Sequence, residues 1–191
     1  MGQYYKPAVL DDSKKRPLAW VYSHDIKVKY TREDGQSFMM GNGLKLMEHS
    51  WMNNKFVQAI ENLLIPGGSW HKQPIVWAGD YADNEPDTDI NIYGMLEDEI
   101  KIIPTKRTLK KKYKYIVNHT KMKYVDKTKV PLDNDGWQIH PLPLLTCEGN
   151  GRGGGDFRGD ETVVGTWARD IISVEETVPE FFTELIFNLT E

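Results

Sequence analysis

The sequence contains very little cysteine, with Cys147 alone among 191 residues. A single cysteine excludes an internal disulfide framework and is typical of proteins kept in a reducing compartment. No apolar run approaches the roughly 18 residues needed to cross a bilayer. The start MGQYYK has no apolar leader, and Lys6 stands where a myristoylation site prefers Ser or Thr. These absences predict a cytoplasmic protein with no membrane partner.

Several familiar chemical motifs are also missing. The five histidines show no short metal-ligand spacing. The acidic stretch 80–89 spaces its carboxylates as a calcium loop does, but it lacks the central glycine and the terminal Glu. Cys147 lies near His140, yet no motif supports a Cys-His nucleophile. The sequence therefore predicts no metal site and identifies no cofactor and no catalytic residue.

What the chain does contain is material for a core, with 39% hydrophobic and 11% aromatic residues. Alternating apolar residues predict an α+β fold that is predominantly β. Helical spacing of apolar residues after a capping Asn predicts one main helix at 53–65. The other expected elements are strands at 17–23, 73–82, 164–175 and 181–190, hairpins at 26–40 and 113–128, and an extended segment at 139–146. A helix remains the alternative for 181–190.

Sparse landmarks recur in the same order and suggest an internal repeat. Tyr5-Lys6 with Val9 resembles Tyr113-Lys114 with Val117, at an offset of 108 residues, and Gly-Asn-Gly recurs at 41–43 and 149–151 with the same offset. Trp77-Ala78-x-Asp80 resembles Trp167-Ala168-x-Asp170 at an offset of 90.

The repeat predicts two similar β-rich halves, 1–103 and 104–191, within one compact unit. Trp77 and Trp167 are then buried in equivalent strands, and Asp80 and Asp170 meet near a pseudo-twofold axis. Chance similarity is the alternative, because each match is short.

The stretch EGNGRGGGDFRGD at 148–160 has glycine at six of its thirteen positions. Glycine permits close approach to the backbone, and successive N–H groups can bind an anion. The segment is neither a Walker loop nor a dinucleotide fingerprint, since the required residues and spacing are absent. A flexible surface loop is the alternative. The predicted ligand-binding set is Asn42, Asp80, Asn150, Arg152, Asp156, Arg158 and Asp170.

Charge is distributed in two opposite blocks. Residues 101–129 carry eleven Lys or Arg against one acid, and residues 80–100 carry eight acids and no base. Three interpretations are open: the blocks are solvated faces, they pair with each other, or each binds a partner. The Lys and Tyr mixture at 106–124 suits a nucleic-acid backbone, but the acidic overall charge and the lack of a nucleic-acid motif argue against that partner.

These observations favour a protein that binds, and could sequester, a small anionic ligand such as a nucleotide through the glycine-rich segment. One alternative is an enzyme acting on such a ligand with Asp80, Asp156 or Asp170 as base or metal ligand. The other is a macromolecular interaction protein that uses its charge blocks. The sequence leaves the oligomeric state open.

Several longer stretches occur together in this chain, including MGQYYK, VWAGDYAD, EGNGRGGGDFRG and WARDIISVE. They resemble a family of uncharacterised proteins of bacteria and their phages, over residues 1 to about 176. The resemblance implies a free-standing protein that acts in the host cytoplasm if it is phage-encoded. It implies no activity, cofactor or catalytic residue.

Overall fold

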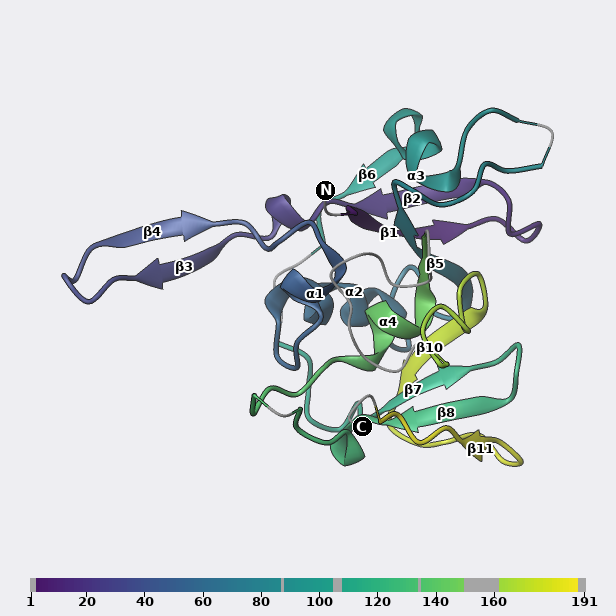
Figure 1. Cartoon of the computed structure of the whole chain (residues 1–191). Helices are drawn as coiled ribbons and strands as arrows, with labels where there is room; N and C mark the ends of the chain where they lie inside the picture. Colours follow the sequence, from purple (N-terminus) through teal and green to yellow (C-terminus); the bar gives the residue numbers. More distant parts are fainter. Residues whose placement is uncertain (1–2, 87, 105–107, 134, 150–161, 189–191) are drawn as a thin grey trace.

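The computed structural model describes residues 3–86, 88–104, 108–133, 135–149 and 162–188. Strands predominate over helices, which confirms the predicted α+β, mainly β fold (Figure 1). The strands are β1 (Tyr5–Leu10), β2 (Pro17–Val21), β3 (Val28–Thr31), β4 (Ser37–Met40), β5 (Gln73–Gly79), β6 (Ile100–Ile102), β7 (Tyr115–Asn118), β8 (Lys123–Asp126), β9 (Cys147–Glu148), β10 (Ile171–Glu175) and β11 (Thr183–Glu184). The helices are α1 (Leu46–His49), α2 (Lys55–Leu64), α3 (Ile92–Met95) and α4 (Pro141–Thr146), with 3-10 turns η1 (Ser23–Asp25), η2 (Leu96–Asp98) and η3 (Lys127–Lys129).

One sheet organises the molecule. Its strand order is β11-β8-β7-β10-β5-β1-β2-β6, and β9 pairs with β5 outside this path. Helix α2 contacts β10 and helix α4 contacts β5, so both helices pack against the middle of the sheet. The β3–β4 hairpin forms a separate sheet and stands away from the rest of the molecule (Figure 1).

The connectivity of the main sheet repeats. In the first set, β1 pairs antiparallel with β2 and β5, and β2 pairs parallel with β6. In the second set, β7 pairs antiparallel with β8 and β10, and β8 pairs parallel with β11. The sets meet where β5 pairs antiparallel with β10. Strand order and direction are therefore the same in the two sets, which lie on either side of residue 103.

The strand registers show that the sequence landmarks cannot all be equivalent. Val9 pairs with Ile75 in the first set, and Val117 pairs with Ser173 in the second. If β1 corresponds to β7 at the predicted offset of 108 residues, these registers make β5 correspond to β10 at an offset of 98 residues. Trp77 then corresponds to Glu175, so the predicted equivalence of Trp77 with Trp167 is wrong.

Trp167 lies before β10, in a run of turns, and not in a strand as predicted. Arg169 takes a φ of 64°, a left-handed value that interrupts extended backbone. The predicted burial is confirmed, however, because Trp77 is 0% and Trp167 is 1% exposed. The backbone N–H of Trp167 donates to the carbonyl of Leu145 at 2.7 Å, which fixes the turn against α4.

Gly41 and Gly149, the first residues of the two Gly-Asn-Gly elements, also occupy different places. Gly41 follows β4, in the separate hairpin, whereas Gly149 follows β9, which pairs with β5. The predicted alignment of Gly41 with Gly149 is therefore wrong, because only one of them borders the main sheet.

Several other elements lie where local sequence patterns predict them. The side chain of Asn54 caps α2, accepting from the N–H groups of Phe56 at 2.8 Å and Val57 at 3.2 Å. The hairpins expected at 26–40 and 113–128 are β3–β4 and β7–β8. The last strand is shorter than predicted, with β11 at Thr183–Glu184.

The segment 139–146 was predicted to be extended, and it is instead helix α4. Its prolines, Pro141 and Pro143, fall in the first turn, where a helix has no intrahelical acceptor for backbone N–H groups. His140 caps the helix, with Nδ1 accepting from the N–H of Leu142 at 3.2 Å. The prolines that argue against a central strand are thus compatible with a helix start.

A buried histidine organises the core beside Trp77. The indole Nε1 of Trp77 can only donate, so Nε2 of His49, at 2.9 Å, accepts. Nδ1 of His49 therefore carries the proton and donates to the carbonyl of Gly43 at 3.1 Å. Burial lowers the pKa of His49 to about 4, outweighing the opposing effects of Gly43 and Glu48.

Acid should therefore destabilise the protein through His49. Its folded pKa lies below the unfolded value of about 6.5, so its contribution is complete above pH 6.5 and is lost as the pH falls towards 4. We expect a loss of about 2 kcal/mol between pH 7 and 5, measured by urea unfolding. In a His49→Gln variant this pH-dependent difference should largely disappear, and an unchanged difference would contradict the assignment.

Candidate functional site

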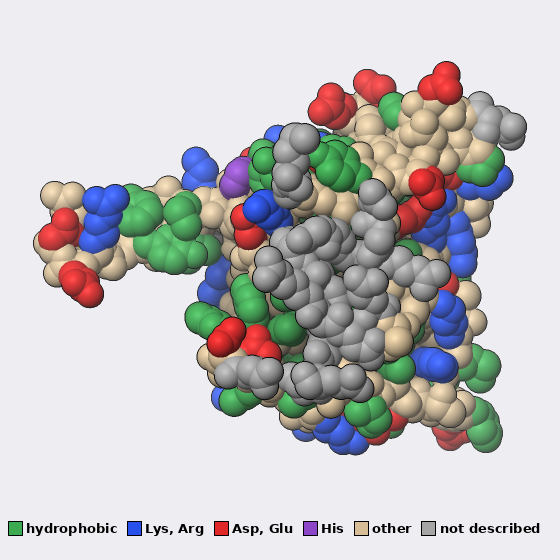
Figure 2. Space-filling view, viewed as in Figure 1, with side chains coloured by type: hydrophobic (Ala, Val, Ile, Leu, Met, Phe, Trp, Pro, Cys, Tyr) green, Lys and Arg blue, Asp and Glu red, His purple; other side chains and the backbone are tan. Residues whose placement is uncertain are grey.

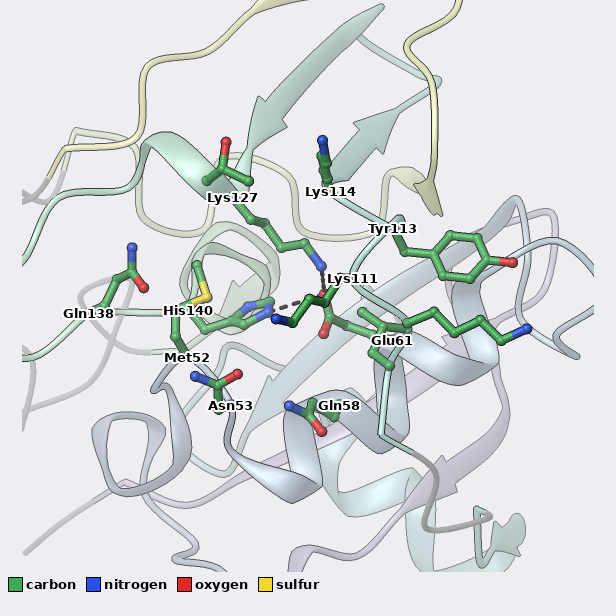
Figure 3. A pocket seen from close by; sticks show the side chains of 13 residues that line it. Met52, Asn53, Gln58, Glu61, Lys111, Tyr113, Lys114, Lys127, Gln138 and His140 are labelled. Carbon is green, nitrogen blue, oxygen red and sulfur yellow. Dashed lines mark hydrogen bonds and ion pairs between the residues drawn. The ribbon is translucent and has the colours of Figure 1, made fainter.

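A pocket of about 520 Å³ opens between α2, the segment before β7, η3 and the start of α4 (Figure 3). Met52 and Tyr113 give it apolar surface, and amide side chains line one side. Its lining residues are Met52, Asn53, Gln58, Glu61, Leu109, Lys110, Lys111, Tyr113, Lys114, Lys127, Thr128, Gln138 and His140. The lining therefore contains four lysines and one carboxylate.

Glu61 is that carboxylate, and it is only 2% exposed. Lys127 Nζ donates to it, and His140 Nε2 lies 3.2 Å from Oε1, as the dashed lines in Figure 3 show. Because Nδ1 of His140 accepts from the backbone of α4, Nε2 carries the proton and donates to Glu61. Burial acts to raise the pKa of Glu61, but His140 and Lys127 outweigh it and lower the pKa to about 2.

The remaining lysines of the pocket come from the segment before β7. Lys110, Lys111 and Lys114 are exposed, and none of them forms an ion pair with a residue that the structure describes. Lys127 and Glu61 already neutralise each other. The positive charge of these three lysines is therefore available to an anion that enters the pocket.

Sequence reasoning missed this site. Val57, Glu61 and Leu64 lie on one face of α2 at spacings of three and four residues, so Glu61 is a carboxylate among core positions. A charged residue on the apolar face of a predicted helix is the sequence signal that could have identified Glu61. Its partners, Lys127 and His140, lie 66 and 79 residues further along the chain, and no local pattern connects them.

Two of the predicted site residues, Asp80 and Asp170, do not meet. Asp80 Oδ1 accepts from the N–H of Tyr4 at 3.0 Å, beyond the end of β5. Asp170 Oδ2 accepts from Asn118 at 2.8 Å, and its backbone oxygen accepts from Ile75 near the start of β5. Five residues of extended chain span about 17 Å, so the predicted convergence of these aspartates is wrong.

The other predicted residues divide into two groups. Asn42 is buried and its Nδ2 donates to the carbonyl of Ile26 at 2.5 Å, which ties together the two ends of the β3–β4 hairpin. Asn150, Arg152, Asp156 and Arg158 lie outside the described residues. Their proposed role in anion binding stays a prediction.

The start of the glycine-rich segment is described, and it is tightly packed. Trp77 and Ala78 of β5 pair with β9, which brings Gly149 beside the end of β5. A Cβ on Gly149 would lie 2.4 Å from Gln3 Nε2 and 2.7 Å from the hydroxyl of Tyr5. Any larger residue at this position would therefore force the side chains of Gln3 and Tyr5 to move.

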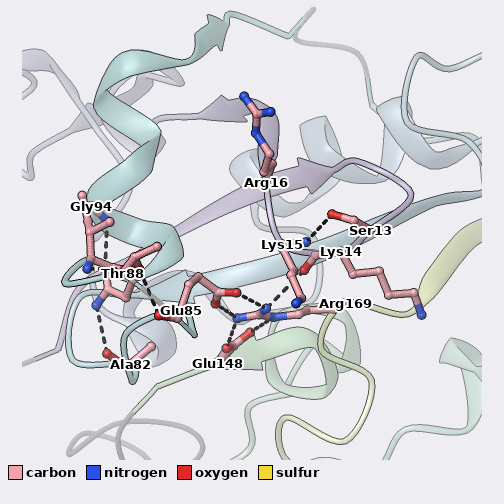
Figure 4. A network of polar contacts seen from close by, with 12 residues as sticks. Ser13, Lys14, Lys15, Arg16, Ala82, Glu85, Thr88, Gly94, Glu148 and Arg169 are labelled. Carbon is pink, nitrogen blue, oxygen red and sulfur yellow. Dashed lines mark hydrogen bonds and ion pairs between the residues drawn. The ribbon is translucent and has the colours of Figure 1, made fainter.

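Arg169 binds Glu148, the residue before Gly149 (Figure 4). Its Nε donates to Glu148 at 2.7 Å, and its Nη1 donates to Glu85 at 3.0 Å and to the carbonyl of Lys14 at 3.1 Å. One guanidinium thus joins the start of the glycine-rich segment, the acidic block and the β1–β2 turn. No ion pair between described residues joins the acidic block 80–100 to the basic block 101–129.

Comparisons with family models, with curated proteins and with solved structures find no match. Within the described ranges, no group of three or more His, Cys, Asp or Glu side chains is placed to hold a metal ion. The same part of the chain has no helix whose length and apolar character would allow it to span a membrane.

Proposed function

We propose that the protein binds a small anion of the nucleotide class in the pocket lined by Lys110, Lys111 and Lys114. The observation that supports this proposal best is the excess of lysines over the single, already neutralised carboxylate. The pocket's volume of about 520 Å³ lies within the range of small-molecule sites, roughly 300–1,000 Å³. The amides of Asn53, Gln58 and Gln138 supply donors and acceptors for a polar group such as a base.

Binding is favoured over catalysis by the state of Glu61. A general acid needs a pKa near the working pH, and the pKa of Glu61 is about 2. A general base needs a carboxylate free to approach the substrate, but Lys127 and His140 occupy this one. The buried pair between Glu61 and Lys127 therefore shapes the floor of a binding site.

Replacing Lys110, Lys111 and Lys114 together by alanine should abolish detectable binding of a nucleotide. Each lost charged hydrogen bond weakens binding by about ten- to a hundred-fold. Titration calorimetry with ATP, with inorganic pyrophosphate as a second probe, measures the affinity at low ionic strength. Added salt should weaken wild-type binding, because the lysines are exposed and their charges are screened.

Lys112→Ala provides the matched control. Lys112 belongs to the same segment and has the same charge, but it pairs with Glu176 and does not line the pocket. Its replacement should leave the affinity within about two-fold of wild type, because the lost charge is already paired. The proposal fails if wild type binds neither probe at millimolar concentration, or if Lys112→Ala weakens binding as much as the triple variant does.

A further inference from the structure

The β3–β4 hairpin, residues 28–40, is an arm that forms its own two-stranded sheet among the described residues. Val28, Tyr30 and their neighbours pair only across the hairpin, and neither strand joins the main sheet. Figure 1 shows the arm projecting away from the body of the molecule. An isolated two-stranded hairpin is marginally stable in water at best, so an arm of this kind gains most from a partner.

One face of the arm is apolar. The register pairs Val28 with Met40 and Tyr30 with Phe38, and alternation along each strand places these two pairs on the same face. The rings of Tyr30 and Phe38 stack at 5.9 Å between centroids. Tyr30 is 42%, Phe38 39% and Met40 49% exposed, and Figure 2 shows hydrophobic side chains gathered along the arm.

The arm also carries charge of opposite sign at its two ends. Its tip holds Glu33 and Asp34, together with Arg32, whose guanidinium lies 5.2 Å from the ring of Phe38. Lys27 and Lys29 lie in its first strand or next to it, near the body. The tip is therefore net negative and the base is basic.

We propose that the apolar face of the arm packs against the same face of a second copy, with the two arms antiparallel. A twofold axis through the stacked faces places Tyr30 and Phe38 of each copy against Val28 and Met40 of the other. The acidic tip of each arm then lies beside the basic base of its partner, which is the charge arrangement that an antiparallel pair requires. A parallel pair would instead bring the two acidic tips together.

The size of this face predicts how tight the pair is. A stable interface buries roughly 800 Å² on each partner, more than a few half-exposed side chains on one short hairpin supply. The association is therefore concentration-dependent. Sedimentation velocity between about 5 and 500 μM at low salt should show a monomer shifting to a dimer.

Changing Tyr30 and Phe38 to serine should raise the dimer dissociation constant by at least ten-fold, as for central aromatic residues of an interface. The melting temperature of the monomer should change little, because the arm does not join the main sheet. Met39→Ser is the matched control. Met39 is 54% exposed but lies on the opposite face of β4, so its replacement should leave the dissociation constant within about two-fold.

Charge reversal tests the orientation of the arms. Glu33→Lys with Asp34→Lys should weaken self-association, and so should Lys27→Glu with Lys29→Glu. An equimolar mixture of these two variants should regain association, because each acidic end then meets a basic one in either orientation. The orientation is decided by the lysine variant alone, because in a parallel pair the two bases already repel each other and the change to glutamate would not weaken association. The proposal is overturned if wild type stays monomeric at 500 μM, if the serine variant still dimerises, or if the mixture associates no better than each variant alone.

Discussion

Replacing Arg169 by methionine should lower the free energy of unfolding by about 2–3 kcal/mol, because Glu85 is buried while Arg169 itself is 22% exposed and only part of the charge is shielded from water. Glu85 is 6% exposed, and Arg169 is the cation that contacts it. Methionine keeps the length of the side chain but leaves the carboxylates of Glu85 and Glu148 without their donor. Urea unfolding at pH 7 measures the change.

Two further variants separate the charge effect from packing. Adding Glu85→Gln and Glu148→Gln to the methionine variant should restore part of the stability, because no uncompensated carboxylate then remains. Lys129→Met removes an ion pair with Glu184 in which the lysine is exposed, and it should cost less than about 1 kcal/mol. Equal losses for Arg169→Met and Lys129→Met would show that the network does not stabilise the fold.

Truncating Trp167 to alanine should also cost about 3–5 kcal/mol, as expected for a buried tryptophan. Its side chain is 1% exposed and belongs to the main core, although its backbone lies in turns. Trp137, which is 59% exposed, is the matched control, and Trp137→Ala should cost less than about 1 kcal/mol. A loss below 1 kcal/mol for Trp167→Ala would indicate that the turn region makes little contribution to the core.

Helices and strands that are determined by residues within one short segment could be predicted from the sequence. The capping Asn54 and the apolar spacing of α2 lie within one segment, as do the alternations of β3–β4 and β7–β8. Helix α4 could not be predicted in this way. Its two prolines are compatible with both an extended segment and a first helical turn, and burial of all its residues decides between them.

The candidate site could not be predicted from the sequence, for a different reason. Lys127 and His140 are unremarkable in their own segments, and they acquire a role only when the fold places them against Glu61. Glycines and arginines directed the sequence prediction to 148–160, where Gly149 is explained by contact with Gln3 and Tyr5. Composition thus directed attention to a segment that begins at a closely packed glycine, Gly149, but it did not identify the pocket.

The junction of β5 with β10 also has a consequence for synthesis on the ribosome. Strands β1, β2, β5 and β6 are complete by residue 102, whereas the outer edge of β5 pairs with β9 and β10, which end at residue 175. At a synthesis rate of roughly 5–20 residues per second, that edge stays unpaired for about 4–15 s until β9 and β10 have been made. An apolar strand edge left open for this time can pair with another nascent chain. The protein is therefore most exposed to misassembly while its second half is still being made.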